Sequence, residues 1–448
     1  MNDVIKKLQK QYFGKKILVV GLGLQGGGSG VAKFFAELGA NVTVTDKKDK
    51  DILKPSIDQL KELSITYYLG GHDIKDFLEA DVIFKGPSVP WTLPEIIEAE
   101  RKGIPVEMEL SFFAKHSPAK IIGVTGTRGK STTTYMIYQA LQAAEYHPYL
   151  AGNLPGVSSL QLLRSLSEND WVVMEIPSWP LAGFHRAKIS PHIAVFTNFY
   201  PDHLNFYKTM NDYLLDKKAI YLQQIEKDIL VAGIELEPIV EKDQIKSTVH
   251  YVSAADFPAR LISLGGTHNK ENAAIALKVA ELVGAKREIA VQTIAEFKGL
   301  PYRQEIVGKK GNIIFINDTT STTPVATIKA FDSFAHQGKK VYLILGGTSK
   351  NLPYDILINQ LIDTEKIILL KGSFTDEILP LLKEKYKDKI TRVFNDLEEA
   401  VNAAYELANK TGGFVLFSPA APSFAMFNNE FHRGEEFNRV VKKIIDHG

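Results

Sequence analysis

Residues 120–144 read KIIGVTGTRGKSTTTYMIYQALQAA and combine three features that decide the fold. The apolar, β-branched run from Ile121 to Thr125 predicts a buried strand, and it leads directly into a turn rich in glycine. The residues from Thr132 to Ala144 carry apolar side chains at helical spacing, which predicts a helix. A strand, a glycine turn and a helix in this order are the repeating unit of parallel α/β sheets.

The same order of elements recurs on both sides of this unit. Strands alternate with helices along the whole chain, and the length predicts about three domains at roughly 150 residues each. We expect an α/β protein with a Rossmann-like N-terminal domain at 1–117, a central P-loop ATPase-type domain at 118–299 and a C-terminal Rossmann-like domain at 300–448. The other predicted strands are Lys15–Val20, Asn41–Asp46, Asp81–Phe84, Ile104–Val106, Trp171–Ile176, His192–Thr197, Asn312–Asn317, Val341–Leu345, Lys366–Leu370 and Phe414–Phe417. Further helices are predicted at Val31–Leu38, Met210–Gln224 and Asn269–Val283.

Composition excludes several classes of protein. The chain has 448 residues, a formal net charge of +1 and no cysteine. It therefore lacks the basic excess typical of nucleic-acid binders, and it has no disulfide, cysteine-ligated metal or thiol nucleophile. No apolar run approaches about 18 residues, so we expect no membrane insertion. Residues 1–16 lack the apolar core of a secretion signal, and we expect a cytoplasmic monomer that acts on small molecules.

The glycine turn inside the opening stretch is typical of a phosphate-binding loop. Glycines allow backbone N–H groups to converge on phosphate oxygens, Lys130 can reach the outer phosphates, and the hydroxyl of Ser131 can bind Mg²⁺. The strict G-x-x-x-x-G-K-[ST] pattern fails by one position, because Val124 stands where its first glycine should be. The position between a strand and a helix favours phosphate binding over a chance glycine turn.

A second glycine turn, Gly21-x-Gly23-x-x-Gly26, follows the first predicted strand. It matches the dinucleotide-binding fingerprint, and Asp46 ends the next strand where an acid would contact a ribose. The turn is also compatible with a purely structural role. A dinucleotide site needs a second mononucleotide half, but the chain starts the phosphate loop instead, so we favour a nucleotide other than NAD.

Polar residues follow the central strands. Glu175 ends one strand, and an acid there points toward the ligand crevice of a parallel sheet unless it simply faces solvent. The segment from Asn198 to His203 follows the next strand, although a lone histidine in that position is more often an ordinary loop residue. Lys217 lies in a helical stretch and would by itself be assigned to a solvated helix face.

Together these motifs resemble the Mur ligase superfamily, ATP-dependent amide-forming enzymes of cell-wall precursor synthesis. The superfamily's phosphate loop, G-T-x-G-K-[ST], is similar to Gly126–Ser131 and explains the missing first glycine. Its A-G-N turn, magnesium-binding glutamate, N-x-x-x-D-H segment and Y-x-x-x-K-x-x-I-Y pattern are matched at Asn153, Glu175, Asn198–His203 and Tyr213–Tyr221.

The later motifs extend the resemblance to the whole chain. They are G-x-H-N-x-x-N at Gly266–Asn272, R-x-E at Arg303–Glu305, N-D at Asn317–Asp318, and the stretch from Ser418 to Phe424 followed by Arg433-Gly434. The last of these most resembles the member of the superfamily that adds D-glutamate to UDP-MurNAc-L-alanine. Thr320 stands where that member usually has a lysine that helps to hold the glutamate.

The resemblance assigns roles to individual residues. It implies catalytic roles for Lys130, Glu175, His203 and Lys217. It implies ATP contacts for Gly126, Thr127, Arg128, Gly129, Lys130, Ser131, Thr132, His268, Asn269, Asn272, Arg303 and Asp318. It implies contacts with the UDP-sugar substrate for Gly23, Leu24, Gln25, Asp46, Asn153 and His203, and with the amino acid for Thr322, Lys350, Ser423 and Phe424. Two Mg²⁺ ions, with Mn²⁺ as an alternative, would be held by Ser131, Glu175, His203 and Lys217, the last as a CO₂-derived carbamate.

The implied reaction is ATP-dependent ligation through an acyl phosphate, in peptidoglycan synthesis and hence in cell-wall biogenesis, cell shape and cell division. Because of Thr320, addition of L-glutamate or another amino acid, or use of a related precursor, stays open. Two other classes remain as alternatives: a Rossmann oxidoreductase that uses NAD(P), and a degenerate nucleotide-binding protein without activity. Binding of NADH and release of phosphate would distinguish them.

Overall fold

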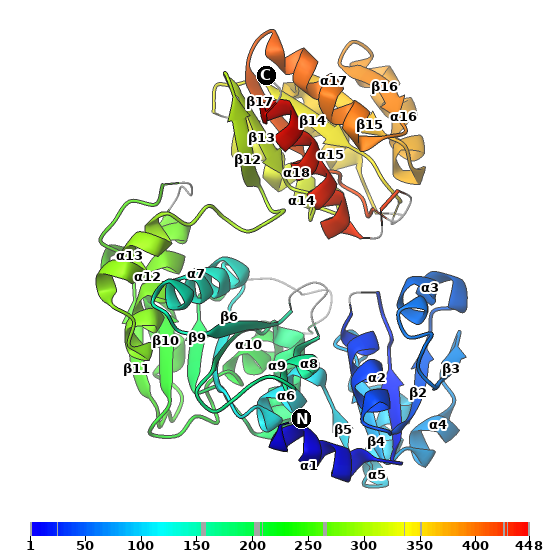
Figure 1. Ribbon diagram of the computed structural model, residues 1–448, viewed down its shortest axis with the longest axis vertical. Helices are drawn as coiled ribbons and strands as arrows, with labels where there is room; N and C mark the ends of the chain where they lie inside the picture. Colours follow the sequence, from blue (N-terminus) through cyan, green and yellow to red (C-terminus); the bar gives the residue numbers. More distant parts are fainter. Residues whose placement is uncertain are drawn as a thin grey trace. The chain divides into compact units, whose positions relative to one another are not determined.

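The computed structural model describes residues 2–24, 26–153, 158–200, 207, 209–262, 267–335, 337–349, 352–423, 426–427 and 429–446. The chain forms three sheets flanked by helices (Figure 1), which confirms the predicted α/β class. It divides into two compact units, Met1–Phe297 and Lys298–Gly448, and the first unit contains two of the sheets.

The first sheet is parallel throughout and has the strand order β3-β2-β1-β4-β5. The order reverses between β1 and β4, so the crevice beyond their carboxyl ends is where a sheet of this kind binds a ligand. Its strands are β1 (Lys16–Val20), β2 (Asn41–Asp46), β3 (Ile65–Leu69), β4 (Val82–Lys85) and β5 (Val106–Glu107). Its helices are α1 (Asp3–Tyr12), α2 (Gly27–Glu37), α3 (Lys50–Asp58), α4 (Ile74–Glu79) and α5 (Pro94–Arg101), and α6 (Glu109–His116) leads into the next region.

The second sheet is also parallel, in the order β11-β10-β9-β6-β8-β7. Because β6 lies between β8 and β9, the loops that follow these three strands emerge side by side at one edge. Its strands are β6 (Lys120–Thr125), β7 (Pro148–Gly152), β8 (Trp171–Glu175), β9 (Ile193–Phe196), β10 (Ile229–Gly233) and β11 (Thr248–Val252). Its helices are α7 (Lys130–Ala143), α8 (Ser159–Leu162), α9 (Ser178–Ala187), α10 (Met210–Lys218), α11 (Glu237–Val240), α12 (Thr267–Val283) and α13 (Arg287–Ala295), with 3-10 turns η1 (Ile234–Leu236) and η2 (Ala254–Asp256).

The third sheet forms the second compact unit and has the order β12-β13-β17-β14-β15-β16. Only its edge strand β12 is antiparallel to its neighbour. The strands are β12 (Glu305–Lys310), β13 (Ile313–Asn317), β14 (Val341–Leu345), β15 (Lys366–Leu370), β16 (Ile390–Phe394) and β17 (Gly413–Phe417). The helices are α14 (Pro324–Ala335), α15 (Asp355–Gln360), α16 (Ser373–Tyr386), α17 (Leu397–Asn409) and α18 (Glu430–Asp446), with the 3-10 turn η3 (Leu361–Asp363).

One hydrophobic core joins the first two sheets. It contains Phe35 of α2, Phe112 of α6 and Leu181 of α9, all buried. The helix α6 therefore packs against elements of both regions, and this shared core explains why they form a single compact unit. None of the helices in the described part of the chain has the length and hydropathy that crossing a bilayer requires.

All four predicted helices differ from the structure at one end or both, by one or two residues in α7 and α12 and by more at one end of α2 and of α10. The helix predicted from Val31 begins at Gly27, because the glycines before it are already helical. The helix predicted over 210–224 ends at Lys218. Beyond it the chain turns to bury Ile220 and Tyr221, and the Tyr221 hydroxyl bonds to Asp243 at 2.7 Å.

Candidate active site

The phosphate-loop candidate lies between β6 and the start of α7 and leaves no room for side chains at two of its glycines. Gly126 has φ +149°, and a Cβ there would lie 1.9 Å from Oγ1 of Thr197. Gly129 has φ +78° and caps α7, and a Cβ there would lie 2.2 Å from Oδ1 of Asn272. Only glycine fits either position without a shift of its neighbours. The loop leads into the first turn of α7, whose backbone N–H groups are of the kind that binds an anion.

The end of β9 holds this loop in place. The N–H of Thr127 donates to the carbonyl of Asn198 at 3.0 Å, and the N–H of Arg128 donates to the Asn198 side chain at 2.9 Å. The hydroxyl of Thr197 donates to the carbonyl of Arg128 at 2.7 Å. Asn198 thus shapes the loop, although it lies 70 residues from Arg128 in the sequence.

Two lysines converge on one carbonyl of the loop. Nζ of Lys130 lies 3.1 Å from the carbonyl oxygen of Gly126, and Nζ of Lys217 lies 2.7 Å from the same atom. Lys217 is only 1 % exposed, and its ammonium lies 4.8 Å from the centre of the Tyr213 ring. The side chain of Lys217 is therefore buried against the phosphate loop. The alternative that it lies on a solvated helix face is wrong.

Glu175 ends β8, immediately beside β6, and is 4 % exposed. Within the described residues, its Oε2 atom has no hydrogen-bond partner. A buried carboxylate oxygen without a partner is costly, and a bound cation is one way to compensate it. Asn153 lies next to it, because the N–H of Asn153 donates to the Glu175 carbonyl at 2.9 Å.

Some of the other residues that the resemblance assigns to a substrate or metal lie near the phosphate loop, and some lie outside the described part of the chain. Ser131 and Thr132 lie in the first turn of α7, and His268 and Asn269 lie in the first turn of α12. Asn272 is buried against the phosphate loop beside Gly129. Four assigned residues lie outside the described part of the chain: Gln25, His203, Lys350 and Phe424.

In the first sheet, Asp46 holds the glycine turn that contains Gly23 and Leu24. Its Oδ2 accepts the N–H groups of Leu22 and Gly23 at 2.9 and 3.3 Å, and its Oδ1 accepts that of Lys48 at 2.9 Å. The predicted ribose contact would therefore have to share a carboxylate of which one oxygen already stabilises the glycine turn and the other already accepts the N–H of Lys48.

In the second unit, Asp318 lies at the end of β13 and is buried. One of its oxygens accepts the Ser418 hydroxyl at 2.6 Å, and the other accepts the N–H of Gln304 at 3.1 Å. Burial raises the pKa of this carboxyl to about 6, against the opposing effect of its hydrogen bonds and of the nearby Arg303 guanidinium. The Thr320 hydroxyl donates to the carbonyl of Tyr302 at 2.9 Å, so it ties the loop after β13 to the segment that precedes β12.

Arg433 joins the two loops that carry the amino-acid candidates Thr322 and Ser423. Its guanidinium donates to the hydroxyl and carbonyl of Thr319, both at 2.9 Å, and to the carbonyl of Ala421 at 3.0 Å. It is fully buried, which lowers its pKa to about 9. Ser423 is buried too, and its hydroxyl has no hydrogen-bond partner among the described residues. The sequence motif that contains Arg433 did not indicate that its guanidinium would bond to Thr319 and Ala421.

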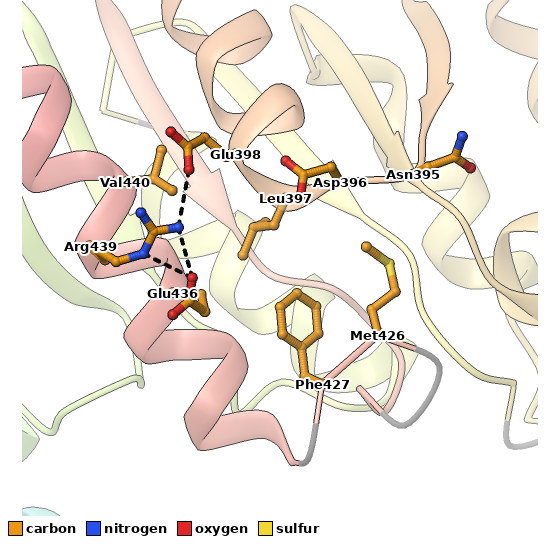
Figure 2. A pocket seen from close by; sticks show the side chains of 9 residues that line it. All are labelled: Asn395, Asp396, Leu397, Glu398, Met426, Phe427, Glu436, Arg439 and Val440. Carbon is orange, nitrogen blue, oxygen red and sulfur yellow. Dashed lines mark hydrogen bonds and ion pairs between the residues drawn. The ribbon is translucent and has the colours of Figure 1, made fainter.

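A cavity of about 330 Å³ lies in the second unit, between the start of α17 and α18 (Figure 2). No sequence motif predicted it. The guanidinium of Arg439 lies at one side and pairs with Glu398 at 3.1 Å and with Glu436 at 2.8 Å. Met426 and Phe427, which line it, follow the Ser423 loop.

Comparisons with known proteins identify the family of this chain. The family described as Mur ligase middle domain matches residues 124–261, and that described as Mur ligase MurD-like, N-terminal domain matches residues 15–107. UDP-N-acetylmuramoylalanine–D-glutamate ligase of Roseiflexus sp. strain RS-1 is 34 % identical over 97 % of this chain and 100 % of its own length.

Two solved structures share the fold. UDP-N-acetylmuramate-alanine ligase MurC of Thermotoga maritima is 20 % identical, with a TM-score of 0.54 over 96 % of this chain and 99 % of its own. MurF ligase of Thermotoga maritima, solved in complex with ADP, is 17 % identical, with a TM-score of 0.51 over 99 % and 100 %. The near-complete match to the Roseiflexus enzyme shows that the chain belongs to the MurD family of Mur ligases.

Proposed function

We propose that the protein is an ATP-dependent ligase that joins D-glutamate to UDP-MurNAc-L-alanine in peptidoglycan precursor synthesis. The observation that carries the proposal is the central site: two lysines meet the phosphate loop at one carbonyl, and the buried Glu175 lies on the adjacent strand. The relatives that match this chain over nearly its whole length carry the name of this ligase.

ATP fits the loop between β6 and α7. The glycine backbone and the first turn of α7 offer N–H groups to its phosphates, and Lys130 and Arg128 add positive charge. The substrate carboxylate attacks the γ-phosphorus, ADP leaves, and an acyl phosphate forms. The amine of glutamate then attacks the acyl carbon, inorganic phosphate leaves, and the amine loses a proton to give the amide. No protein nucleophile is required, so catalysis rests on positioning and on charge stabilisation.

Magnesium fits the hydroxyl of Ser131 and the Oε2 atom of Glu175, which has no hydrogen-bond partner in the described part of the chain, with His203 as a further ligand. Two Mg²⁺ ions, or Mn²⁺ in their place, would neutralise negative charge on the phosphate groups during transfer. Glu175 ends a strand beside β6 and Ser131 lies in the first turn of α7, so they can face a common ligand.

Lys217 fits the proposed carbamate. Addition of CO₂ to its neutral amine yields a carboxylate that can act as a metal ligand. The nitrogen of a carbamate keeps one N–H, so the hydrogen bond from Lys217 to the Gly126 carbonyl can persist after modification. Lys217 is buried, and its amine lies beside the Tyr213 ring and the phosphate loop, where a carbamate would face the proposed ATP site.

The remaining substrates are assigned to the two flanking regions. The turn from Gly21 to Gly26 lies where a doubly wound sheet binds a nucleotide, and Asp46 and Asn153 each lie at the carboxyl end of a strand. Glutamate is assigned to the second unit, at Thr322, Lys350, Ser423 and Phe424. Its carboxylates would suit the Ser423 hydroxyl, for which the described residues offer no hydrogen-bond partner. We place the protein in the cytoplasm as a monomer.

An amino-acid panel tests the proposal. Purified protein is incubated with ATP, Mg²⁺, UDP-MurNAc-L-alanine and one amino acid, and phosphate release is measured together with the mass of the product. Phosphate release and a glutamyl adduct with D-glutamate alone support the proposal. Product with L-glutamate or another amino acid instead would overturn the choice of substrate, and no phosphate release with any combination would overturn the ligase assignment.

A further inference from the structure

The helix α2 contains more glycine than a helix normally tolerates, with Gly27, Gly28 and Gly30 in its first turns. Glycine inside a helix is destabilising relative to alanine, so these positions need a reason. Gly28 packs against the preceding turn, because a Cβ there would lie 2.3 Å from the Gly21 carbonyl. At Gly30 a Cβ would lie 2.4 Å from both side-chain atoms of Ser158, which precedes α8 in the central region. Gly30 therefore lets α2 approach the start of α8 closely.

Glu109, the first residue of α6, lies between these two helices. Its Oε1 accepts the Ser158 hydroxyl and the N–H of Ser159, both at 3.0 Å. Its Oε2 lies 3.4 Å from the place a Cβ on Gly27 would occupy, in the first turn of α2. One carboxylate thus contacts the start of α2 on one side and the start of α8 on the other.

The contacts continue from α8 to the central site. The Ser159 hydroxyl accepts the N–H of Gly152 at 3.1 Å, at the end of β7. The next residue, Asn153, donates its N–H to the carbonyl of Glu175 at 2.9 Å. Glu109 is therefore connected through short hydrogen bonds to the segment that carries Asn153, and by direct packing to the first turn of α2.

We propose that Glu109 is a positioning residue that holds the first turn of α2 at a fixed distance from Asn153. This distance decides whether the nucleotide-sugar substrate can contact both segments at once. This inference rests on the proposed function, in which the nucleotide of the UDP-sugar substrate binds at the glycine turn before α2 and the same substrate also contacts Asn153. A substrate that bridges two segments depends on the distance between them, whereas UDP alone contacts only the first segment.

The test compares Glu109→Ala, Glu109→Gln and the milder Ser158→Ala. Glutamine keeps the shape and an oxygen that can accept from Ser158 and Ser159, so it should rescue the function that alanine loses. The matched control is Glu107→Gln, which removes a carboxylate two residues earlier that pairs with Lys115 at 3.7 Å instead. The KM values of UDP-MurNAc-L-alanine and ATP, kcat, and the Kd of UDP are measured for each variant.

Glu109→Ala should raise the KM of UDP-MurNAc-L-alanine about tenfold or more, because it removes the two hydrogen bonds that Oε1 accepts at the start of α8. The KM of ATP and the Kd of UDP should stay within about twofold to threefold of wild type, and Ser158→Ala should raise the KM by a smaller factor. Equal losses for all ligands, or no rise in the KM of UDP-MurNAc-L-alanine in either alanine variant, would overturn the positioning role.

A readout without substrate separates this inference from the proposed function. Glu109→Ala should accelerate amide hydrogen exchange both at 27–31 and at 158–162, and Glu107→Gln should accelerate neither. If wild type proves inactive with every amino acid, the proposed function fails, and the exchange result still decides whether Glu109 joins the two segments. If Glu109→Ala left the rate of amide hydrogen exchange unchanged at both segments, Glu109 would not connect them.

Discussion

Replacing Gly129 with alanine should reduce kcat/KM for ATP about a hundredfold while the protein still folds. Gly129 has φ +78°, and alanine in the left-handed region costs about 1–2 kcal/mol. Its Cβ would lie 2.2 Å from Oδ1 of Asn272, well inside the 3.4 Å at which ordinary contact begins, so the loop or Asn272 must shift by about 1 Å. A displacement of that size at a positioned reacting group costs about a hundredfold in rate.

Gly103→Ala is the matched control, because Gly103 has φ +79° and a Cβ there would meet no atom within 4 Å. It should lose about 1–2 kcal/mol of stability from the backbone alone and keep full activity. Gly129→Ala should lose about 1–3 kcal/mol more from overpacking. Asn272→Ala, combined with Gly129→Ala, should recover that additional loss but not the backbone cost.

The assay combines thermal unfolding with initial rates at saturating UDP-MurNAc-L-alanine and glutamate. If Gly129→Ala kept kcat/KM for ATP within about threefold of wild type, the loop would not bind phosphate through this backbone. If Gly103→Ala lost as much activity as Gly129→Ala, the loss could not be attributed to the loop.

Buried charged groups give three further predictions. Lys217→Ala should lose most activity, and high bicarbonate should not restore it; near-wild-type turnover would refute the carbamate. Burial raises the pKa of Asp318 from 3.8 to about 6, so the folded protein holds that proton more tightly. Stability should therefore fall by up to about 3 kcal/mol between pH 4 and pH 6 and change little above, and Asp318→Asn should remove this part of the dependence in melts from pH 4 to pH 8. Arg433→Lys cannot keep the three bonds to Thr319 and Ala421, so the KM of the amino acid should rise about tenfold while the KM of ATP stays constant; an unchanged amino-acid KM would contradict this.

Local patterns in the sequence predicted many of the elements, although the strands Ile65–Leu69, Ile229–Gly233 and Thr248–Val252 were not predicted despite their apolar or β-branched runs. The strand at Asn41–Asp46 and those at Val341–Leu345 and Lys366–Leu370 have the predicted bounds, because each is a short apolar or alternating run between turn residues. The strand β7 was missed, since Pro148–Gly152 contains a proline and a glycine that normally indicate a turn. The glycine loop before α7 was recognised because its sequence places the glycines and the lysine in one continuous segment.

Contacts between distant segments were not predictable in the same way. Nothing near Gly129 in the sequence indicates that Asn272 fills the space beside it, and nothing near Gly27 indicates Glu109. The buried position of Lys217 likewise depends on how α10 packs beside the phosphate loop, although the family pattern at Tyr213–Tyr221 drew attention to it. These side chains act through tertiary packing, which a single sequence does not specify residue by residue.

The most direct test of the central claim follows oxygen from the substrate carboxylate. UDP-MurNAc-L-alanine labelled with ¹⁸O in its carboxylate is incubated with the protein, ATP, Mg²⁺ and D-glutamate, and the released phosphate is analysed by mass spectrometry. Ligation through an acyl phosphate predicts one ¹⁸O atom in each released phosphate, because the bridging oxygen leaves with phosphorus. Formation of the amide with unlabelled phosphate would contradict the account, since the carboxylate would then never have been phosphorylated.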